Sequence, residues 1–413
     1  MYKIYLDEDV ATRFRKTVND YINLSINQKY KTKNISETNA WNTICSIMDR
    51  IEDLAFYLNQ KELNNGNWRR CAFDFFEFIE QAGVLVGCID GIFEIYDVKF
   101  EKHNTIFKSK KINSNVKCDK DDCELDDAYF QYIRSLSSVH PSNTTRYKVF
   151  QEAVFEVSPY AMWNGNALAL TNPNADLVIV SYNNETSDFL INKAIVISEI
   201  FNYIKYKYYS LNYLSKKISL NYEKIIANLR TEKIKKPSEF NNYNLYLDNL
   251  KLEVLKRNSD MECDIQEIIG IFNLKITNTN NHIKFEKYKK TLKYAMHLFH
   301  RQLQNMDFNC ISQFDRLLRE LLLGNIYFKD DNYHYPLSKI VYLKEDSGDK
   351  SWGLVQYKAL LKVFEQYVDI SINDLYVLSY HELYVLAQIA LYFHALEFDN
   401  IISRMIPNTD DYR

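Results

Sequence analysis

The sequence has few of the residues that end helices and form tight turns. Its 413 residues include 9 glycines and 6 prolines, whereas tyrosine occurs 32 times and phenylalanine 24 times. Because glycine and proline are the strongest breakers of regular structure, their scarcity favours long helices over a β-sandwich or β-barrel. Hydrophobic residues make up 46% of the chain, so a sizeable core can be buried, and the length suits two or three domains.

The sequence also lacks a long apolar run and a strong charge of one sign. Its longest uncharged apolar stretches, around 82–89 and 383–396, are too short for a helix that crosses a bilayer, so we expect no membrane anchor. The formal net charge is −3 at pH 7. This charge argues against a uniformly basic coat protein for nucleic acid but allows local basic patches.

The seven cysteines give neither a disulfide framework nor a zinc pattern. Their number is odd, most lie in apolar helical patterns, and no secretory signal precedes them, which predicts a reduced, cytoplasmic protein. No second pair of cysteines or histidines lies near Cys118 and Cys123 at zinc-site spacing. Glycine-rich loops that bind phosphate groups are also missing from the sequence. We therefore expect no metal and no cofactor.

Apolar residues recur at helical spacing in the first part of the chain. From Asn39 they are separated by three or four residues, up to a break at Asn64-Asn65-Gly66. A second helix is predicted from about residue 67 to residue 87 or beyond. A third is predicted to end near Val139, because Pro141 disfavours helical geometry at the residue before it. The predicted buried face of the second helix comprises Phe73, Phe76, Ile79 and Ala82.

Residues 153–183 are rich in strand formers and are interrupted by turn signals. The turn signals are Asn164-Gly165-Asn166 and Asn172-Pro173-Asn174, which predict a small antiparallel hairpin or a three-stranded sheet. Helical patterns then return. Ser379 and Glu382 form a capping-box pattern, so the last helical region is predicted to break in two. The predicted helices after the sheet are 187–230, 243–257, 285–323, 352–368 and 372–399.

The predicted fold is therefore mainly α and has three parts. An N-terminal helical domain covers 1–152, a small β element covers 153–185, and a C-terminal helical domain covers 186–413.

Two segments, 99–120 and 205–236, are rich in lysine, and tyrosines are interleaved in the second. Lysines attract phosphate groups and aromatic faces stack on bases, so both segments are candidates for RNA contact. The alternative is a solvated helix face whose tyrosines pack inward and whose lysines extend over apolar neighbours. The candidate RNA-binding residues are Lys108, Lys110, Lys111, Lys205, Lys207, Lys216 and Lys217.

His297 and His300 share one face of a predicted helix. Metal ligation is conceivable for such a pair, but no carboxylate pattern accompanies it, so an ordinary surface or core role is favoured.

Arg134 and His140 lie at the end of the third predicted helix, in YIRSLSSVHP. A histidine transfers a proton near neutral pH, and an arginine binds a phosphate in fixed geometry and offsets developing charge. This pair suffices for RNA cleavage by the substrate's own 2′-hydroxyl, which needs neither a metal nor a nucleophilic side chain. The alternative is that Arg134 pairs with a nearby acid and His140 caps a helix end.

The segments WNTICSIMDRIEDLAFYLN and CAFDFFEFIEQAGVLVGCI, followed by YIRSLSSVHP, resemble the HEPN superfamily. Its members carry an Arg, four to six residues and a His near the end of a late helix, and they include ribonuclease toxins and anti-phage abortive-infection proteins. The resemblance covers roughly residues 36–150. Ser135 departs from the pattern, because many members have Asn, Asp or His directly after the Arg.

The resemblance implies a HEPN-like helical bundle with metal-independent endoribonuclease activity. Arg134 would bind the scissile phosphate and His140 would serve as acid or base. The expected partners are RNA, a second copy of the chain in a homodimer, and a regulatory or antitoxin protein. The family also contains non-catalytic members, so the alternative is a helical scaffold or regulatory protein that binds protein, nucleotide or RNA.

Overall fold

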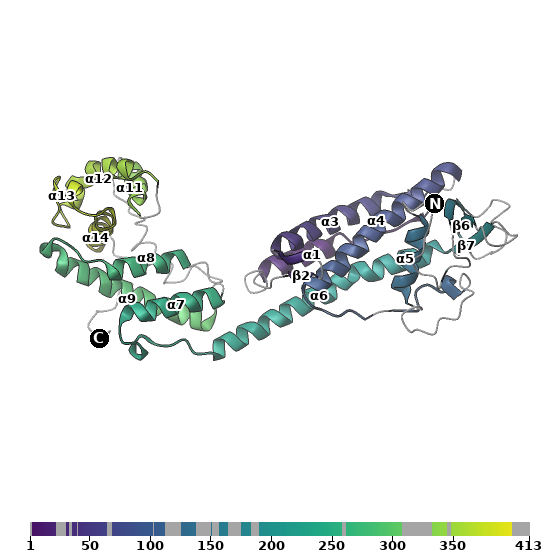
Figure 1. Ribbon diagram of the computed structural model, residues 1–413, viewed down its shortest axis with the longest axis horizontal. Helices are drawn as coiled ribbons and strands as arrows, with labels where there is room; N and C mark the ends of the chain where they lie inside the picture. The colour runs from purple at the N-terminus through teal and green to yellow at the C-terminus, as the bar shows by residue number, and fades with distance from the viewer. Residues whose placement is uncertain are drawn as a thin grey trace. The chain divides into compact units, whose positions relative to one another are not determined.

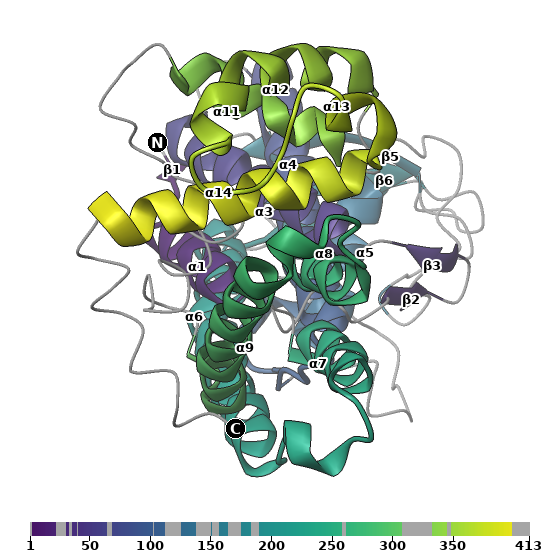
Figure 2. The ribbon, with the colours of Figure 1, turned by 90° about the vertical axis from the view of Figure 1, so that its left-hand side faces the viewer.

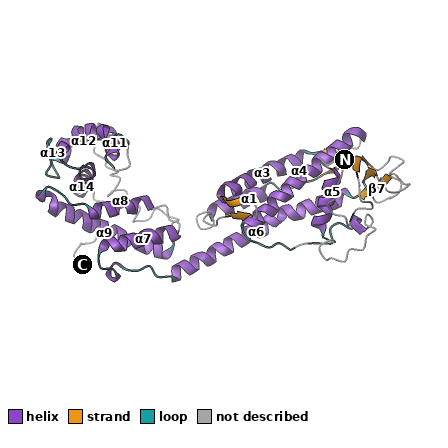
Figure 3. Ribbon diagram, in the orientation of Figure 1, coloured by secondary structure: helices purple, strands orange, loops and turns teal. Residues whose placement is uncertain are grey.

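The protein is mainly α-helical, as the sequence predicts (Figure 3). Contacts divide the chain into two compact units, Met1–Glu223 and Lys224–Arg413. None of the described helices is long and apolar enough to cross a membrane. The computed structural model describes residues 2–21, 30–32, 35–38, 40–63, 68–101, 103–111, 125–137, 150, 157–163, 175–182, 190–257, 262–307, 333–344 and 348–398.

The boundary between the units lies later in the chain than the sequence indicated. The β element and most of the following helix belong to the first unit, because that helix packs its apolar face into the first core. The apolar residues of the second core begin at Ile234. The helix residues in the first core are Ile197, Ile200, Tyr203, Ile204, Tyr208, Leu211, Leu214 and Ile218.

The first unit is built on two long helices that run side by side, α3 and α4 (Figure 1). In α3 the predicted apolar positions are buried, among them Ile44, Met48 and Ile51, except Ile47, which is partly buried. The predicted face of α4 is partly wrong, because Phe73 is 72% exposed while Phe75 and Phe78 are buried. The helices of this unit are α1 (Asp9–Asp20), α3 (Ala40–Gln60), α4 (Trp68–Ile95), α5 (Asp126–Ser137) and α6 (Ile197–Thr231).

The N-terminal segment is anchored by a buried amide on α3. The backbone N–H of Leu6 donates to Asn59 Oδ1 at 2.7 Å, and Asn59 Nδ2 donates to the Leu6 carbonyl at 2.8 Å. Strand β1 (Tyr2–Lys3) pairs with β4 (Glu62–Leu63) beside this contact. Helix α1, which the sequence did not predict, buries Val10, Ala11, Phe14 and Val18.

The described strands of the first unit form three antiparallel arrangements. Two are two-stranded, β1 with β4 and β2 (Tyr30–Thr32) with β3 (Ile35–Thr38). The third is the predicted small sheet, in the order β5 (Val157–Trp163), β6 (Leu177–Tyr182) and β7 (Leu190–Ile195). The predicted strand and turns within 164–174 lie outside the described residues.

The third strand of the small sheet occupies residues that were predicted to start a helix. Helix α6 begins at Ile197 instead of 187, and Asp176 caps its first N–H group. Its Oδ2 accepts the Ile197 N–H at 2.9 Å, and its Oδ1 accepts the Tyr2 hydroxyl at 2.7 Å.

Two carboxylates hold the segment 103–111 against α5 and α6. Asp126, the first residue of α5, accepts the N–H groups of Ile106 and Phe107 at 2.9 and 3.2 Å. Glu199, in the first turn of α6, accepts those of Lys108 and Ser109, both at 3.1 Å. The segment ends in the 3-10 turn η1 (Ser109–Lys111).

The second unit surrounds a single apolar helix, α14. This helix lies between α11–α13 on one side and α8–α9 on the other (Figures 1 and 2). Its residues 382–392 are all buried, and most of them are apolar, which is the pattern of a helix in the middle of a core. The helices of this unit are α7 (Tyr243–Arg257), α8 (Glu262–Asn273), α9 (His282–Asn305), α11 (His334–Lys339), α12 (Lys350–Phe364), α13 (Asp374–Val377) and α14 (Tyr380–Phe398), and its 3-10 turns are η4 (Pro237–Glu239), η5 (Thr279–Asn281) and η8 (Ile340–Leu343).

The predicted break before the last helix is confirmed. Ser379 Oγ accepts the N–H of Glu382 at 3.1 Å, which is half of a capping box. The Glu382 carboxylate binds Thr277 instead, accepting its N–H at 2.6 Å and its hydroxyl at 2.7 Å. Helix α9 ends at Asn305 with Met306 in a left-handed conformation, and the rest of the predicted helix from 308 to 323 lies outside the described residues.

Candidate functional site

Arg134 lies in the last turn of α5, and its side chain reaches Glu80 on α4. Its Nε and Nη2 donate to Glu80 Oε2 at 3.3 and 3.2 Å, and the side chain is 35% exposed. The alternative prediction for Arg134, an ion pair with a nearby acid, is therefore present in the structure. His140 lies outside the described residues, so its predicted place beside Arg134 stays a prediction.

Gly83 provides the space in which the Arg134 side chain crosses α4. A Cβ atom added at Gly83 would lie 2.6 Å from Arg134 Cδ and 2.7 Å from Arg134 Nε, which is closer than real contacts allow. Beside this crossing, Glu80 Oε1 is buried and accepts no hydrogen bond from any described residue. The guanidinium of Arg134 is thus bound by one carboxylate oxygen of Glu80, and the other, buried oxygen of Glu80 lies beside it.

Two of the predicted RNA-binding lysines are buried in ion pairs, which corrects their assignment. Lys207 Nζ lies 2.9 Å from a carboxylate oxygen of Asp90 and 2.9 Å from one of Asp127. Lys110 Nζ lies 3.1 Å from Asp126 Oδ1, and both partners are buried. These ammonium groups hold helices and segments together inside the first unit, so they are not available to RNA phosphates.

The other predicted lysines remain candidates for RNA contact to different degrees. Lys108, Lys216 and Lys217 are exposed, and Lys217 Nζ lies 5.2 Å from the centre of the Tyr213 ring. Lys205 is half-buried, and the side chain of Lys111 lies outside the description. The interleaved tyrosines divide between core and surface, because Tyr203 and Tyr208 are buried and Tyr213 is 40% exposed.

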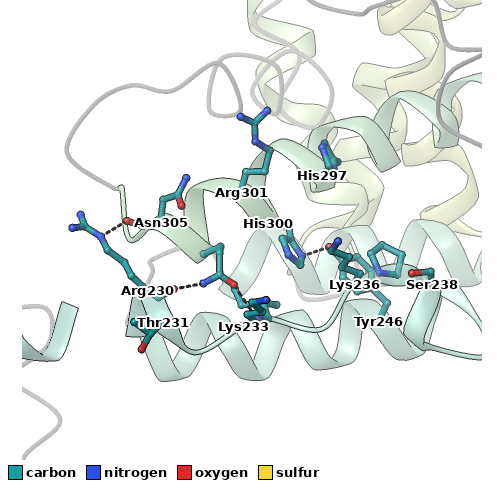
Figure 4. A pocket seen from close by; sticks show the side chains of 13 residues that line it. Arg230, Thr231, Lys233, Lys236, Ser238, Tyr246, His297, His300, Arg301 and Asn305 are labelled. Carbon is teal, nitrogen blue, oxygen red and sulfur yellow. Dashed lines mark hydrogen bonds between the residues drawn. The ribbon is translucent and has the colours of Figure 1, made fainter. Parts of the chain in front are cut away.

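The second unit contains a basic cavity that the sequence did not predict. It has a volume of about 1090 Å³ and lies among the end of α6, the segment into η4, and helices α7 and α9 (Figure 4). Its described lining contains no aspartate and no glutamate. The basic and imidazole side chains that line it are Arg230, Lys233, Lys236, Arg301, His297 and His300.

The walls of this cavity are joined by hydrogen bonds between the end of α6 and the end of α9. Arg230 Nε donates to the Asn305 carbonyl at 2.8 Å, and Gln304 Nε2 donates to the Arg230 carbonyl at 2.8 Å. Gln304 Oε1 accepts the N–H of Ile234, also at 2.8 Å. The segment that leaves α6 is therefore fixed to α9 along one side of the cavity.

The two histidines of α9 face this cavity, and His300 bonds to an aromatic residue of α7. The Tyr246 hydroxyl lies 3.1 Å from His300 Nδ1, with the ring centres 6.1 Å apart. Burial, then nearby positive charges, lower the pKa of His300, and burial and Arg301 lower the pKa of His297. Both shifts favour the neutral imidazole over the charged form.

A metal centre is not found at these histidines. Within the described ranges, no three side chains of histidine, cysteine, aspartate or glutamate come together as metal ligands. Cys118 and Cys123 lie outside those ranges. The sequence signal for the cavity was the end of the lysine-rich segment 205–236, but its convergence with α9 could not be read from spacing.

Comparison of the chain with family models, with curated proteins and with solved structures gives no match. The function is therefore argued from the residues and their geometry.

Proposed function

We propose that the chain is a metal-independent endoribonuclease of the HEPN type, acting in a toxin-like or anti-phage system. The observation that carries the proposal is the fixed, one-third exposed guanidinium of Arg134. It lies at the end of α5, within a helical unit, where the pattern that resembles the family requires an arginine. His140 follows six positions later in the sequence.

The ion pair with Glu80 is compatible with phosphate binding. It uses Nε and Nη2 of Arg134, while Nη1 has no acceptor among the described residues. A carboxylate that holds one edge of a guanidinium leaves the remaining N–H groups pointing in a defined direction, where they form charge-assisted bonds to a phosphate. Glu80 would then act as a positioning residue for Arg134.

The proposed reaction is an internal transfer within the RNA. The 2′-oxygen loses its proton and attacks the adjacent phosphorus, the bond from phosphorus to the 5′-oxygen breaks, and that oxygen gains a proton. The products are a 2′,3′-cyclic phosphate and a 5′-hydroxyl. His140 transfers protons, and Arg134 offsets the charge that develops on the phosphate oxygens.

A second copy of the chain would complete the site. One arginine and one histidine supply few contacts to a phosphate, whereas a two-fold interface that includes residues 128–147 would bring two pairs into one cleft. We therefore propose a homodimer as the active form.

The test is a cleavage assay on RNA in the presence of EDTA. Wild-type protein should cut, and His140→Ala should lose roughly a hundredfold or more of the rate, the usual contribution of proton transfer. Arg134→Lys should also lose activity, because lysine lacks the planar fork. His103→Ala, an exposed histidine of the same unit, is the control and should cut like wild type.

The second candidate is a non-catalytic helical protein, which the Arg134–Glu80 ion pair favours. In that case the wild-type protein would not cut RNA, and Arg134→Lys would change only stability. Cleavage that stops in EDTA, or that continues unchanged in His140→Ala, would contradict the nuclease proposal.

A further inference from the structure

We infer that the basic cavity of the second unit binds a small phosphorylated ligand of the nucleoside polyphosphate class. This site is distinct from the RNA-cleaving site proposed at Arg134 and His140, and its residues all belong to Lys224–Arg413.

The charge of the cavity favours an anion. Arg230, Lys233, Lys236 and Arg301 line it, and no carboxylate among the described lining residues offsets them. Of the carboxylates nearby, Glu232 pairs with Lys256, and Glu239 accepts the backbone N–H of Lys236 at 2.5 Å. The single charge of Glu239 is outnumbered by the four cations of the lining. Like charges that share a cavity repel each other, and a polyphosphate would relieve this repulsion.

Helix ends explain only part of this positive charge. Helices α6 and α9 both end at the cavity, and basic side chains favour the negative ends of helices. Arg230 has this role, because it donates to the carbonyl of Asn305, and the buried Arg257 donates to the carbonyls of Leu229 and Glu232 at 3.2 and 2.9 Å.

Three further cations of the lining do not bind the carbonyl groups at the helix ends. Lys233, Lys236 and Arg301 donate no side-chain hydrogen bond to a carbonyl or carboxylate of the described residues. Their ammonium and guanidinium groups are therefore available to phosphate oxygens, and Arg301 offers the planar fork that binds a phosphate through two N–H groups.

The size and the apolar lining favour a nucleotide over a bare phosphate. A volume of about 1090 Å³ lies just above the usual range of ligand sites and far exceeds the needs of one phosphate. The apolar part of the lining consists of Pro237, which is exposed, and of Ile234 and Tyr246, which are buried. Figure 4 shows Tyr246 next to His300. A base can pack on the exposed Pro237 ring while its phosphates reach the lysines and Arg301.

The experiment is calorimetric titration of the full chain with three probes, without Mg²⁺: a nucleoside triphosphate, inorganic tripolyphosphate, and the unphosphorylated nucleoside. We expect the nucleoside triphosphate to bind most tightly. Arg301→Gln and Lys233→Gln should each weaken it roughly tenfold or more, the effect of losing one charge-assisted hydrogen bond. Both side chains are exposed, so both variants should fold like wild type.

Lys358→Gln, an exposed lysine of α12 in the same unit, is the matched control and should bind like wild type. The inference is overturned if no probe binds, if Arg301→Gln binds like Lys358→Gln, or if tripolyphosphate binds as tightly as the nucleotide. The same titration on His140→Ala protein keeps the result separate from the nuclease proposal, because that variant retains the whole cavity.

Discussion

Two glycines of α4 provide a matched test of the position of Arg134. A Cβ at Gly83 would lie 2.6 Å from Arg134 Cδ, whereas a Cβ at Gly87 meets nothing within 4 Å. Gly87→Ala should therefore raise the free energy of unfolding by about 0.5–1 kcal/mol, because alanine favours a helix over glycine.

Gly83→Ala should not show this gain, since Arg134 must leave Glu80, and RNA cleavage should fall at least roughly tenfold. Chemical denaturation and the cleavage assay measure the two effects. Equal behaviour of the two alanine variants in both measurements would show that the place of Arg134 over α4 is unimportant.

The histidines of the basic cavity predict a pH dependence of stability. The pKa of His300 lies below its ordinary value of 6.5, because burial, His297, Lys236 and Arg257 outweigh the opposite effect of Glu239. The unfolded chain therefore binds more protons near pH 6 than the folded chain does. The contribution to stability is fully present above pH 6.5 and falls as the pH decreases through the folded pKa.

We expect a lower melting temperature for the second unit at pH 5.5 than at pH 7.5. His300→Gln should reduce this difference while keeping a polar partner for Tyr246. A bound phosphate would favour the charged imidazoles. The increase in melting temperature that the nucleotide causes should therefore be larger at the lower pH. If the nucleotide raises the melting temperature by the same amount at both pH values, the two histidines do not interact with the ligand.

Among the elements, α6 shows why a charged residue can belong to a core. Lys207 lies on the same helix face as Tyr203, Leu211 and Leu214, and its ion pairs join α6 to Asp90 of α4 and Asp127 of α5. Lys207→Met should lower the free energy of unfolding by about 1–3 kcal/mol, since Asp90 and Asp127 each lose an ion-pair contact.

Lys216→Met, on the exposed face of the same helix, should stay within about 0.5 kcal/mol of wild type. In a filter-binding assay with RNA the order should reverse, because only the exposed lysine contributes salt-sensitive affinity. A neutral effect of Lys207→Met on unfolding would mean that the buried ion pairs contribute nothing.

The elements that the sequence predicted are those with a strong period or a clear cap. Helix α3 has a regular apolar face, and the break before α14 has its serine cap. Helix α1 was missed because charged residues separate its four buried positions and its N-cap residue, Glu8, makes no side-chain cap bond. Strand β7 was assigned to a helix because its pairing partner β6 and the residue that caps the following helix, Asp176, are distant in sequence.

The candidate sites were predictable to different degrees, depending on whether their residues are close together in the sequence. Arg134 could be found because its motif is local. The basic cavity could not, because its six cationic and imidazole side chains come from two stretches of the chain, 230–236 and 297–301, that lie far apart in sequence. The burial of Lys207 was readable in principle from its four-residue spacing to Tyr203 and Leu211, but charge alone suggested an exposed side chain.

For the whole molecule, two separate cores predict two unfolding transitions. Phe78 is buried in the first core and Phe299 in the second. Phe78→Ala and Phe299→Ala should each remove about 3–5 kcal/mol from one transition in scanning calorimetry and leave the other in place. Their control is Phe56→Ala, which alters a side chain that is 57% exposed. A single transition lowered by both buried substitutions would show one cooperative unit.

The carboxylates that hold residues 103–111 have a consequence for hydrogen exchange. Four successive amides, from Ile106 to Ser109, donate to the side chains of Asp126 and Glu199 instead of to a helix or sheet. These amides should exchange with deuterium as slowly as amides of regular structure. Glu199 stands 91 positions after Lys108, so Glu199→Gln would be detected by mass spectrometry as faster deuterium uptake in a peptide far from the altered residue. A peptide covering 103–111 therefore serves as a native reporter of whether the start of α6 is in place.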